Sequence, residues 1–388
     1  MIKGKATLRR RFNQNSGQMS GATRRQFLGK MALGGAAATV GTLAMPNVSR
    51  AQTVVWRFQS SWPQRDIFHE VAQDYVKRVN AMAGNRLKLE LLPAGAVVGA
   101  FQIQDAVHSG ALEGGHGAVA YWYGKHKAFS MFGTAPPWGW DANMLLGWFY
   151  YGGGEALYRE LVNDMIKVNT ISFLTAPHPT QPLGWFKKEI RSVQDIKGLK
   201  YRTIGLAADL MAEMQAAVTI LPGGDIVPAM DRGLLDGAEF NNPSSDRVLG
   251  FPDVAKVYML QSWHQRTETF EILFNKSKYE ALPAELQAII RYAAESASAD
   301  FSWKNQDRYS RDLEEMVQKH GVKAIQTPRE VLDAQLDAWD RVIARLSTDP
   351  FIKKIMESQK NWVKRVAGFY HVYEADNRMA FDHFFKTV

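Results

Sequence analysis

The strongest constraint on the fold is an alternation of strand-like and helix-like segments that begins near residue 54. Residues 54–59 have strand character, 68–79 carry apolar side chains on one helical face, and 87–92 alternate as a strand. A helix at 101–109 and a strand at 117–122 are predicted next. Such alternation predicts an α/β fold with a largely parallel sheet, whose ligands bind beyond the carboxyl ends of the strands.

The alternation resumes after residue 176 and then gives way to helices. The patterns predict strands at 183–186, 200–203 and 271–275, helices at 207–217 and 226–233, and a strand end at 238–240 before a polar loop at 241–245. Beyond Pro283 the apolar residues recur almost everywhere at helical spacing. Because 388 residues exceed one ordinary core, we predict two α/β domains with long C-terminal helices. The predicted division is 52–176 plus 266–326 for the first domain, 177–265 for the second, and 327–388 for the helical extension.

Residues 1–51 differ in kind and resemble a twin-arginine signal peptide. They hold nine Lys or Arg and no Asp or Glu, with the pattern TRRQFL at 23–28, an uncharged stretch at 31–45 and a small-residue site at 49–51. The uncharged stretch is short for a membrane span, although a retained anchor is the alternative. We predict export by the twin-arginine pathway to the periplasm.

Removal of this leader changes the charge of the chain. Subtracting nine from 47 basic residues leaves 38, against 39 acidic ones, so the net charge falls from +8 to −1. The basic balance belongs to the leader and gives no support to nucleic-acid binding. The absence of cysteine excludes disulfides and thiolate metal sites.

Motifs of the common enzyme classes are missing from the sequence. It has no P-loop, no G-x-S-x-G and no H-E-x-x-H, and its histidines do not fall at metal-ligand spacings. Ser244, Ser245 and Asp246 fit a turn and a helix cap better than a hydrolase site. These observations favour a binding protein over an enzyme.

Four ordered motifs resemble the solute-binding proteins of tripartite ATP-independent periplasmic (TRAP) transporters. They are PHPTQPLGWFKKEI at 177–190, KGLKYR at 197–202, LPGGDI at 221–226 and DGAEFNN at 236–242. The resemblance covers the whole chain after the leader, including the helical tail. It implies a two-domain periplasmic solute-binding fold, TRAP membrane subunits as partners, and a branch that binds 2-oxo acids or lactate with a cation.

Arg202 and Gln181 are the first candidates for the ligand site. A planar guanidinium matches a carboxylate with two parallel hydrogen bonds, so Arg202 is the predicted anchor. Gln181 offers both an amide oxygen and an NH₂ group, so it can bind a cation and touch the ligand. The alternatives are a surface ion pair for Arg202 and a hinge residue bonded only to backbone for Gln181.

Glu239 is the candidate that predicts a cation, because a carboxylate repels an anionic ligand. Arg202, Glu239 and a monocarboxylate sum to −1, which Na⁺ would neutralise and Ca²⁺ would bring to +1. Hard cations take oxygen ligands. The resemblance implies Glu239, the Gln181 side chain and the Phe240 backbone carbonyl as ligands, although related proteins often have Trp where Phe240 stands. A salt bridge to a nearby Lys or Arg is the alternative for Glu239.

Three further residues complete the predicted substrate site. Asn241 can donate to a carboxylate or hydroxyl, or simply form a turn. Trp122 and Tyr123 end a predicted strand and can wall the pocket, or belong to the core.

These residues predict capture of a small organic monocarboxylate, a 2-oxo or 2-hydroxy acid, by hinge closure around segments 175–180 and 265–270. A periplasmic enzyme using Glu239 as base and His264 as acid is one alternative, and a sensory binding protein is another. Large apolar side chains in the tail either pack on their own domain or form a homodimer, and we favour the dimer. They are Trp339, Trp362, Phe369, Tyr370, Tyr373, Phe381 and Phe384.

Overall fold

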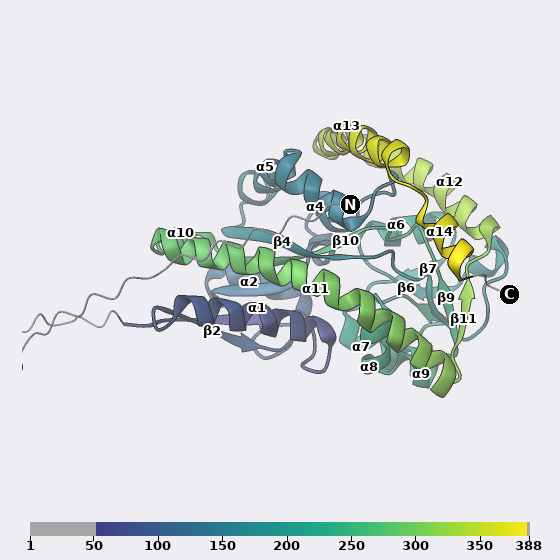
Figure 1. Ribbon diagram of the computed structural model, residues 1–388, viewed down its shortest axis with the longest axis horizontal. Helices are drawn as coiled ribbons and strands as arrows, with labels where there is room; N and C mark the ends of the chain where they lie inside the picture. The colour runs from purple at the N-terminus through teal and green to yellow at the C-terminus, as the bar shows by residue number, and fades with distance from the viewer. Residues whose placement is uncertain (1–51, 386–388) are drawn as a thin grey trace, which may run out of the picture. The chain divides into compact units, whose positions relative to one another are not determined.

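The computed structural model describes residues 52–385, so the predicted signal peptide lies outside the described residues. Two mixed sheets organise this part of the chain, with helices packed around them (Figure 1). We call the parts built on the five-stranded and six-stranded sheets the first and second lobes. No helix of residues 52–385 is both long and apolar enough to cross a membrane.

The first lobe contains five strands in the order β2-β1-β3-β10-β4. Strands β1, β2 and β3 run parallel, whereas β10 is antiparallel to both of its neighbours. Its first helix, α1, is capped by Asp66, which accepts from the Phe68 N–H at 3.0 Å, and ends at Gly84 with φ +59°. The elements of this lobe are β1 (Val54–Ser60), α1 (Ile67–Ala83), β2 (Leu87–Leu92), α2 (Ile103–Ser109), β3 (Gly114–Ala118), α3 (Ser130–Gly133), α4 (Ala142–Tyr151), α5 (Gly154–Arg159), β4 (Thr170–His178), β10 (Glu268–Asn275) and α10 (Lys276–Glu280).

The second lobe contains six strands in the order β11-β9-β5-β8-β6-β7. Here β5 is the antiparallel strand, and β6 lies parallel to both β7 and β8. The elements are β5 (Gly184–Phe186), β6 (Lys200–Arg202), α6 (Leu206–Glu213), β7 (Ala217–Thr219), α7 (Gly223–Asp231), β8 (Gly237–Ala238), α8 (Pro243–Leu249), α9 (Phe251–Val254), β9 (Val257–Leu260) and β11 (Lys323–Gln326).

Two crossing segments join the lobes, residues 179–183 between β4 and β5 and residues 261–267 between β9 and β10. They contact each other, since the Gln181 N–H donates to the Gln265 carbonyl at 3.1 Å. The long helix α11 (Ala284–Lys319) also contacts both lobes, packing on β4 and α1 at one end and on α8 at the other (Figure 1). The β4–β10 pairing shifts register between Glu268 and Phe270, at the border of the second crossing. Such irregularities re-aim side chains next to functional sites.

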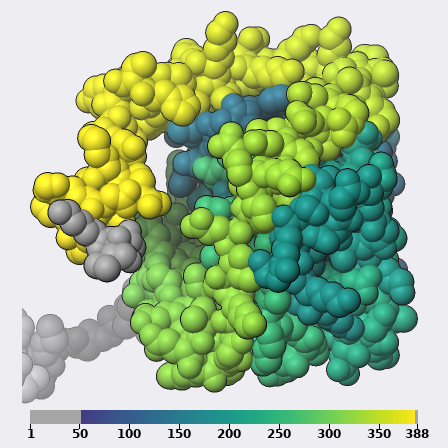
Figure 2. Space-filling view, turned by 90° about the vertical axis from the view of Figure 1, so that its right-hand side faces the viewer, coloured from purple at the N-terminus to yellow at the C-terminus, as the bar shows by residue number. Residues whose placement is uncertain are grey.

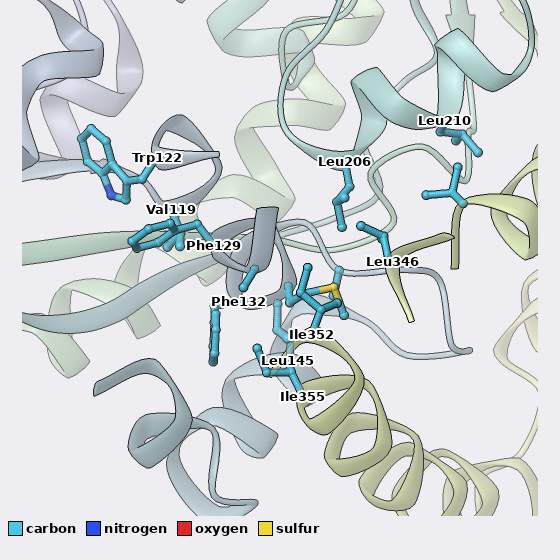
Figure 3. Close-up of a cluster of buried hydrophobic side chains, with 14 of the residues drawn as sticks. Val119, Trp122, Phe129, Phe132, Leu145, Leu206, Leu210, Leu346, Ile352 and Ile355 are labelled. Atoms are coloured by element: carbon cyan, nitrogen blue, oxygen red, sulfur yellow. The ribbon is translucent and has the colours of Figure 1, made fainter. Parts of the chain in front are cut away.

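The C-terminal helices pack on both lobes. Helix α12 (Arg329–Leu346) lies against α6, and α13 (Pro350–Tyr373) lies against α3, α4 and α5. Figure 3 shows the side chains that meet there, and we call six of them the bridging cluster: Leu145, Leu206, Leu210, Leu346, Ile352 and Ile355. All six are buried. This apolar contact therefore joins the two lobes through the tail.

Beyond residue 368 the tail leaves the body of the protein. Tyr373 is 73% exposed and Phe384 is 75% exposed, with Phe369 and Phe381 about half exposed. In Figure 2 the yellow end of α13 and the helix α14 (Asn377–Phe384) stand away from the rest. Of the tail residues named from the sequence, Trp339 is fully buried and Trp362 partly buried, while the later ones are exposed.

Several sequence expectations differ from the structure. Strand β11 pairs with β9 in the second lobe, so residues 266–326 do not all follow the first lobe. Strand β3 lies at 114–118 instead of 117–122. Its glycines allow close packing that a side chain would block, since a Cβ at Gly114 would lie 2.6 Å from the Phe274 ring. Helix 207–217 is shorter than predicted and gives way to β7, and the polar run at 241–245 already begins α8.

Candidate functional site

The carboxyl ends of two parallel strands bring the first pair of functional side chains together. Strand β6 ends at Arg202, and Glu239 directly follows β8. Arg202 faces Ala238 in the strand register, and the Glu239 N–H donates to the Arg202 carbonyl at 3.3 Å. This is the sheet edge at which ligands bind in α/β folds.

Arg202 is held rigidly and is only 1% exposed. Its Nη1 donates to the Glu239 carboxylate and to the Glu239 backbone carbonyl, both at 3.0 Å. Its Nε and Nη2 both donate to the Leu221 carbonyl, at 2.8 and 2.6 Å. Since a guanidinium has five N–H groups, one Nη2 N–H is left for a ligand.

Glu239 is fully buried and forms an ion pair with Arg202 at 3.0 Å. Burial raises its pKa to about 7, and the guanidinium only partly offsets that rise. The salt bridge considered for Glu239 is therefore present, but it uses Oε1 alone. Within residues 52–385 its Oε2 has no hydrogen-bond partner. A buried carboxylate oxygen without a partner is costly unless a cation or donor joins it.

The two crossing segments contribute amide oxygens that, like Glu239 Oε2, are buried and unpaired within residues 52–385. Gln181 lies on the first crossing and Gln265 on the second, and the Oε1 atoms of both are buried without a partner among the described residues. Gln265 Nε2 lies 3.5 Å from Glu239 Oε1. These neutral and anionic oxygens form a donor set of the kind that Na⁺ and Ca²⁺ prefer. Residues 52–385 hold no cluster of three or more His, Cys, Asp or Glu that fits a metal ion.

Glu268, the first residue of β10, is a second buried carboxylate that sequence reasoning missed. It accepts a hydrogen bond from Gln181 Nε2 at 2.6 Å and another from Asn241 Nδ2. Burial, with a smaller contribution from the neighbouring Glu239, raises its pKa to about 8. A charged residue in a segment already expected to be a hinge was the available signal.

Asn241 serves both the predicted turn and the site. Its backbone N–H donates to Asp246 Oδ1 at 3.3 Å, and its Oδ1 accepts from Asn242 Nδ2 at 2.8 Å. Asn242 caps α8, as the Asn-Pro-Ser-Ser-Asp run predicts, by accepting from the N–H groups of Ser244 and Ser245. The cap and the bond to Glu268 together fix the orientation of Asn241.

Phe240 is buried, with its ring centre 5.9 Å from the Arg202 guanidinium carbon. The ring also rests on Gly223, where an added Cβ would lie 2.4 Å from it. This close contact explains the glycine in the LPGGDI motif. We call Gln181, Arg202, Glu239, Asn241, Gln265 and Glu268 the polar cluster.

Trp122 and Tyr123 do not join the polar cluster through their polar atoms. Trp122 Nε1 donates to Glu271 inside the first lobe, and the Tyr123 hydroxyl donates to Asp209 of α6 at 2.5 Å. Both line a cavity of about 360 Å³ with Tyr121, Ile204 and Gly205, at the border of the two lobes. Their predicted contact with substrate stays a prediction.

His264 is buried and bonds through Nδ1 to the Ser262 hydroxyl at 2.6 Å. Burial and the nearby Arg202 lower its pKa to about 3. The imidazole is therefore neutral at neutral pH and has no acidic proton to give.

Comparison with known proteins adds the first independent information. The family model described as bacterial extracellular solute-binding protein, family 7, matches residues 58–349. The monocarboxylate 2-oxoacid-binding periplasmic protein of Nostoc sp. strain PCC 7120 is 32% identical over 367 residues, which are 93% of this chain and 98% of that protein.

Solved structures of TRAP solute-binding proteins match the fold closely. The protein from Bordetella bronchiseptica, with calcium and picolinate in one site of a dimer, is 29% identical, with a TM-score of 0.79, covering 86% of this chain and 97% of that one. The Colwellia psychrerythraea protein, with calcium and pyruvate, is 29% identical, with a TM-score of 0.78 over 86% and 100% of the chains. The Pseudoalteromonas atlantica protein, with sodium and pyruvate, is 30% identical, with a TM-score of 0.78 over 87% and 99%.

Proposed function

This chain belongs to the bacterial extracellular solute-binding proteins of family 7, and from that premise we propose that it is the solute-binding subunit of a TRAP transporter. Its ligand is a small organic monocarboxylate, captured between the lobes together with a cation. The observation that carries this proposal is the buried Arg202–Glu239 ion pair, with a second buried carboxylate, Glu268, close enough for the guanidinium to lower its pKa.

The charges of the polar cluster define which cation fits. Arg202, an ionised Glu239 and a bound monocarboxylate sum to −1 while Glu268 is protonated, which its pKa of about 8 favours at neutral pH. Na⁺ then brings the sum to zero and Ca²⁺ brings it to +1; if Glu268 ionises, Ca²⁺ brings it to zero. Either cation is therefore compatible with the site, depending on the state of Glu268.

The proposed cation ligands are Glu239 Oε2, the amide oxygens of Gln181 and Gln265, and the Phe240 carbonyl. Arg202 and Asn241 are the proposed contacts of the acid. Pyruvate and picolinate, the acids in the related structures, each place a second donor atom beside a carboxylate oxygen. We infer that a 2-oxo or 2-hydroxy acid uses both of its donor atoms to chelate the cation here, so that neither the acid nor the cation binds well alone.

A thermal-shift and calorimetric screen tests this function. Pyruvate, other 2-oxo acids and lactate are compared with acetate and propionate, which lack the second donor, each with Na⁺, with Ca²⁺ and with chelator. We expect the 2-substituted acids to raise the midpoint only with a cation, and acetate and propionate to do so weakly. If none of the acids raises the midpoint, the substrate class is wrong.

Closure of the two α/β lobes about the crossing segments is the proposed mechanism of capture. The lobes already touch at the rim, where Tyr123 and Lys127 bond Asp209, and at Ser245, which donates to Asp66 at 2.8 Å. A neutral His264 argues against acid catalysis, and no bond of the ligand needs to break. A transporter gene beside this one would separate a transport subunit from a sensor.

Export and assembly complete the proposal. The family is extracytoplasmic, and we infer delivery to the periplasm by the twin-arginine pathway, with cleavage after residue 51 testable from the mass of the secreted protein.

The exposed apolar side chains of α13 and α14 support a homodimer, since a patch of this kind rarely stays in water. Light scattering should give twice the chain mass, and Phe381→Asp should lower it.

A further inference from the structure

A second cavity, of about 470 Å³, lies behind the junction of the crossing segments and carries its own set of polar groups. Residues 177–178 line it from the end of β4, and Pro179 and Arg266 line it from the two crossings. Asp141 and Asn143 line it from the start of α4, and Asn305 and Tyr309 from α11. None of the six members of the polar cluster lines it. It is therefore a different cavity from the proposed carboxylate and cation site, although the nearby Glu268 contributes to the raised pKa of Tyr309.

Arg266 is the charged group of this cavity. It is partly buried, and among residues 52–385 it makes neither an ion pair nor a side-chain hydrogen bond. Burial lowers its pKa, and the negative charge of Asp141 opposes that effect without coming within ion-pair distance. A guanidinium withdrawn from water without a bonded partner is costly, so a ligand that bonds it would be stabilising.

Two buried side chains face the same cavity with unused hydrogen-bonding groups. Asn305 is 3% exposed and Tyr309 is 8% exposed, and the Asn305 Nδ2 and Tyr309 hydroxyl have no partner in the described part of the chain. Each can donate a hydrogen bond. The N-terminus of the ten-residue helix α4 adds a partial positive charge, which Asp141 partly offsets as its cap.

We propose that this cavity is a binding site for a small oxyanion, with Arg266, Asn305 and Tyr309 as donors. A carboxylate or a sulfate-like ion offers acceptors to all three groups and neutralises the guanidinium. His178 adds no charge, because burial lowers its pKa to about 3. The Asp141 carboxylate restricts the site to a singly or doubly charged ion and disfavours larger polyanions.

The position of the site gives such an ion contact with the moving parts of the protein. Both crossing segments and α11 line the cavity, and these are the connections that hinge motion must rearrange. An anion bound there would bond one crossing segment to a helix that spans both lobes. This role does not depend on the identity of the cleft ligand.

Calorimetric titration with sodium sulfate and, separately, sodium acetate tests the proposal. The titrations use the full chain carrying Arg202→Gln, so that the cleft lacks its own guanidinium. We expect one saturable anion per chain, and about tenfold or greater weakening on adding Arg266→Gln or Asn305→Ala. Arg232→Gln, which removes a charge from an exposed arginine, is the matched control and should change nothing. Saturable binding of sulfate, of acetate or of both supports the site and identifies the oxyanion chemistry that it accepts.

A crystal of the unmutated chain soaked in sodium selenate locates the ion directly and does not depend on any variant folding. An anomalous peak beside Arg266 is the expected result. The proposal is overturned if no anion binds saturably, if Arg232→Gln weakens binding as much as Arg266→Gln, or if the selenate peak lies elsewhere.

Discussion

The two lobes meet through two contacts of opposite chemistry, the polar cluster and the bridging cluster. Within the described part of the chain, the polar cluster leaves buried oxygens of Gln181, Glu239 and Gln265 without partners, so its free energy depends on what else is bound. The bridging cluster is apolar and buried throughout, and it needs no ligand (Figure 3). The polar cluster is thus suited to a change of state on ligand binding, and the bridging cluster is suited to holding the lobes together with or without ligand.

The largest effect is expected from Arg202→Gln in the polar cluster. It leaves Glu239 buried and unpaired, and truncating one partner of such a pair costs about 3–5 kcal/mol. Affinity for pyruvate with Ca²⁺, measured by calorimetry, should fall at least about a hundredfold, while Arg232→Gln should leave it unchanged. Comparable affinity in the two variants would remove Arg202 from the site.

Ile355→Ala should act on the other contact and affect folding instead of binding. Removing a fully buried isoleucine side chain costs about 2–5 kcal/mol of unfolding free energy. Denaturant unfolding should show this loss, with pyruvate affinity nearly constant. Leu336→Ala, at a position 39% exposed, should cost much less. A large fall in affinity for Ile355→Ala would mean that the two contacts are not separable.

Glu268→Gln tests how the polar cluster orients its amides. By accepting from Gln181 Nε2, Glu268 leaves Gln181 Oε1 free to face a cation, and loss of such an outer partner costs about 10–100-fold in metal affinity. The Ca²⁺ concentration needed for pyruvate binding should rise by that factor. Glu271→Gln on the same strand should lower stability without altering the Ca²⁺ dependence.

The pH dependence should reveal the same carboxylates. Burial raises the pKa values of Glu239, Glu268, Asp66 and Asp246 to about 7–8, so their stabilising contribution is present at acidic pH and is lost as pH rises through those values. Without ligand, the thermal midpoint should therefore fall between about pH 5 and 8. A cation competes with the Glu239 proton, so its affinity should rise by at most about tenfold per pH unit below pH 7. A midpoint that rises with pH over that range in the free protein would contradict these assignments.

The smallest effect is expected at the rim, from Tyr123→Phe. It removes one hydrogen bond between the lobes, worth about 0.5–1.5 kcal/mol. Pyruvate should dissociate a few times faster in stopped-flow measurements, because the closed form loses one contact. Tyr151→Phe, on a residue 87% exposed, controls for the chemical change.

Local pattern was enough to predict part of this molecule from its sequence. Strong periodicity located β1, α1 and β2, and the charge conflict between Glu239 and an anionic ligand pointed to a cation. The lobe of β11 was missed because strand pairing over long sequence distances leaves no local pattern. Glu268 was missed for the same reason, since its role depends on contacts with Gln181 and Asn241 across 87 and 27 residues.

The short turn between α12 and α13 limits how far the lobes can travel. Only residues 347–349 separate Leu346 from Pro350, and an extended tripeptide spans roughly 10 Å. Asp349 caps α13 by accepting hydrogen bonds from the N–H groups of Phe351 and Ile352, so one of the three connecting residues is already held in place. Opening of the lobes therefore has to pivot about the tail, and release of the ligand needs a swing at the rim instead of separation near residues 347–349.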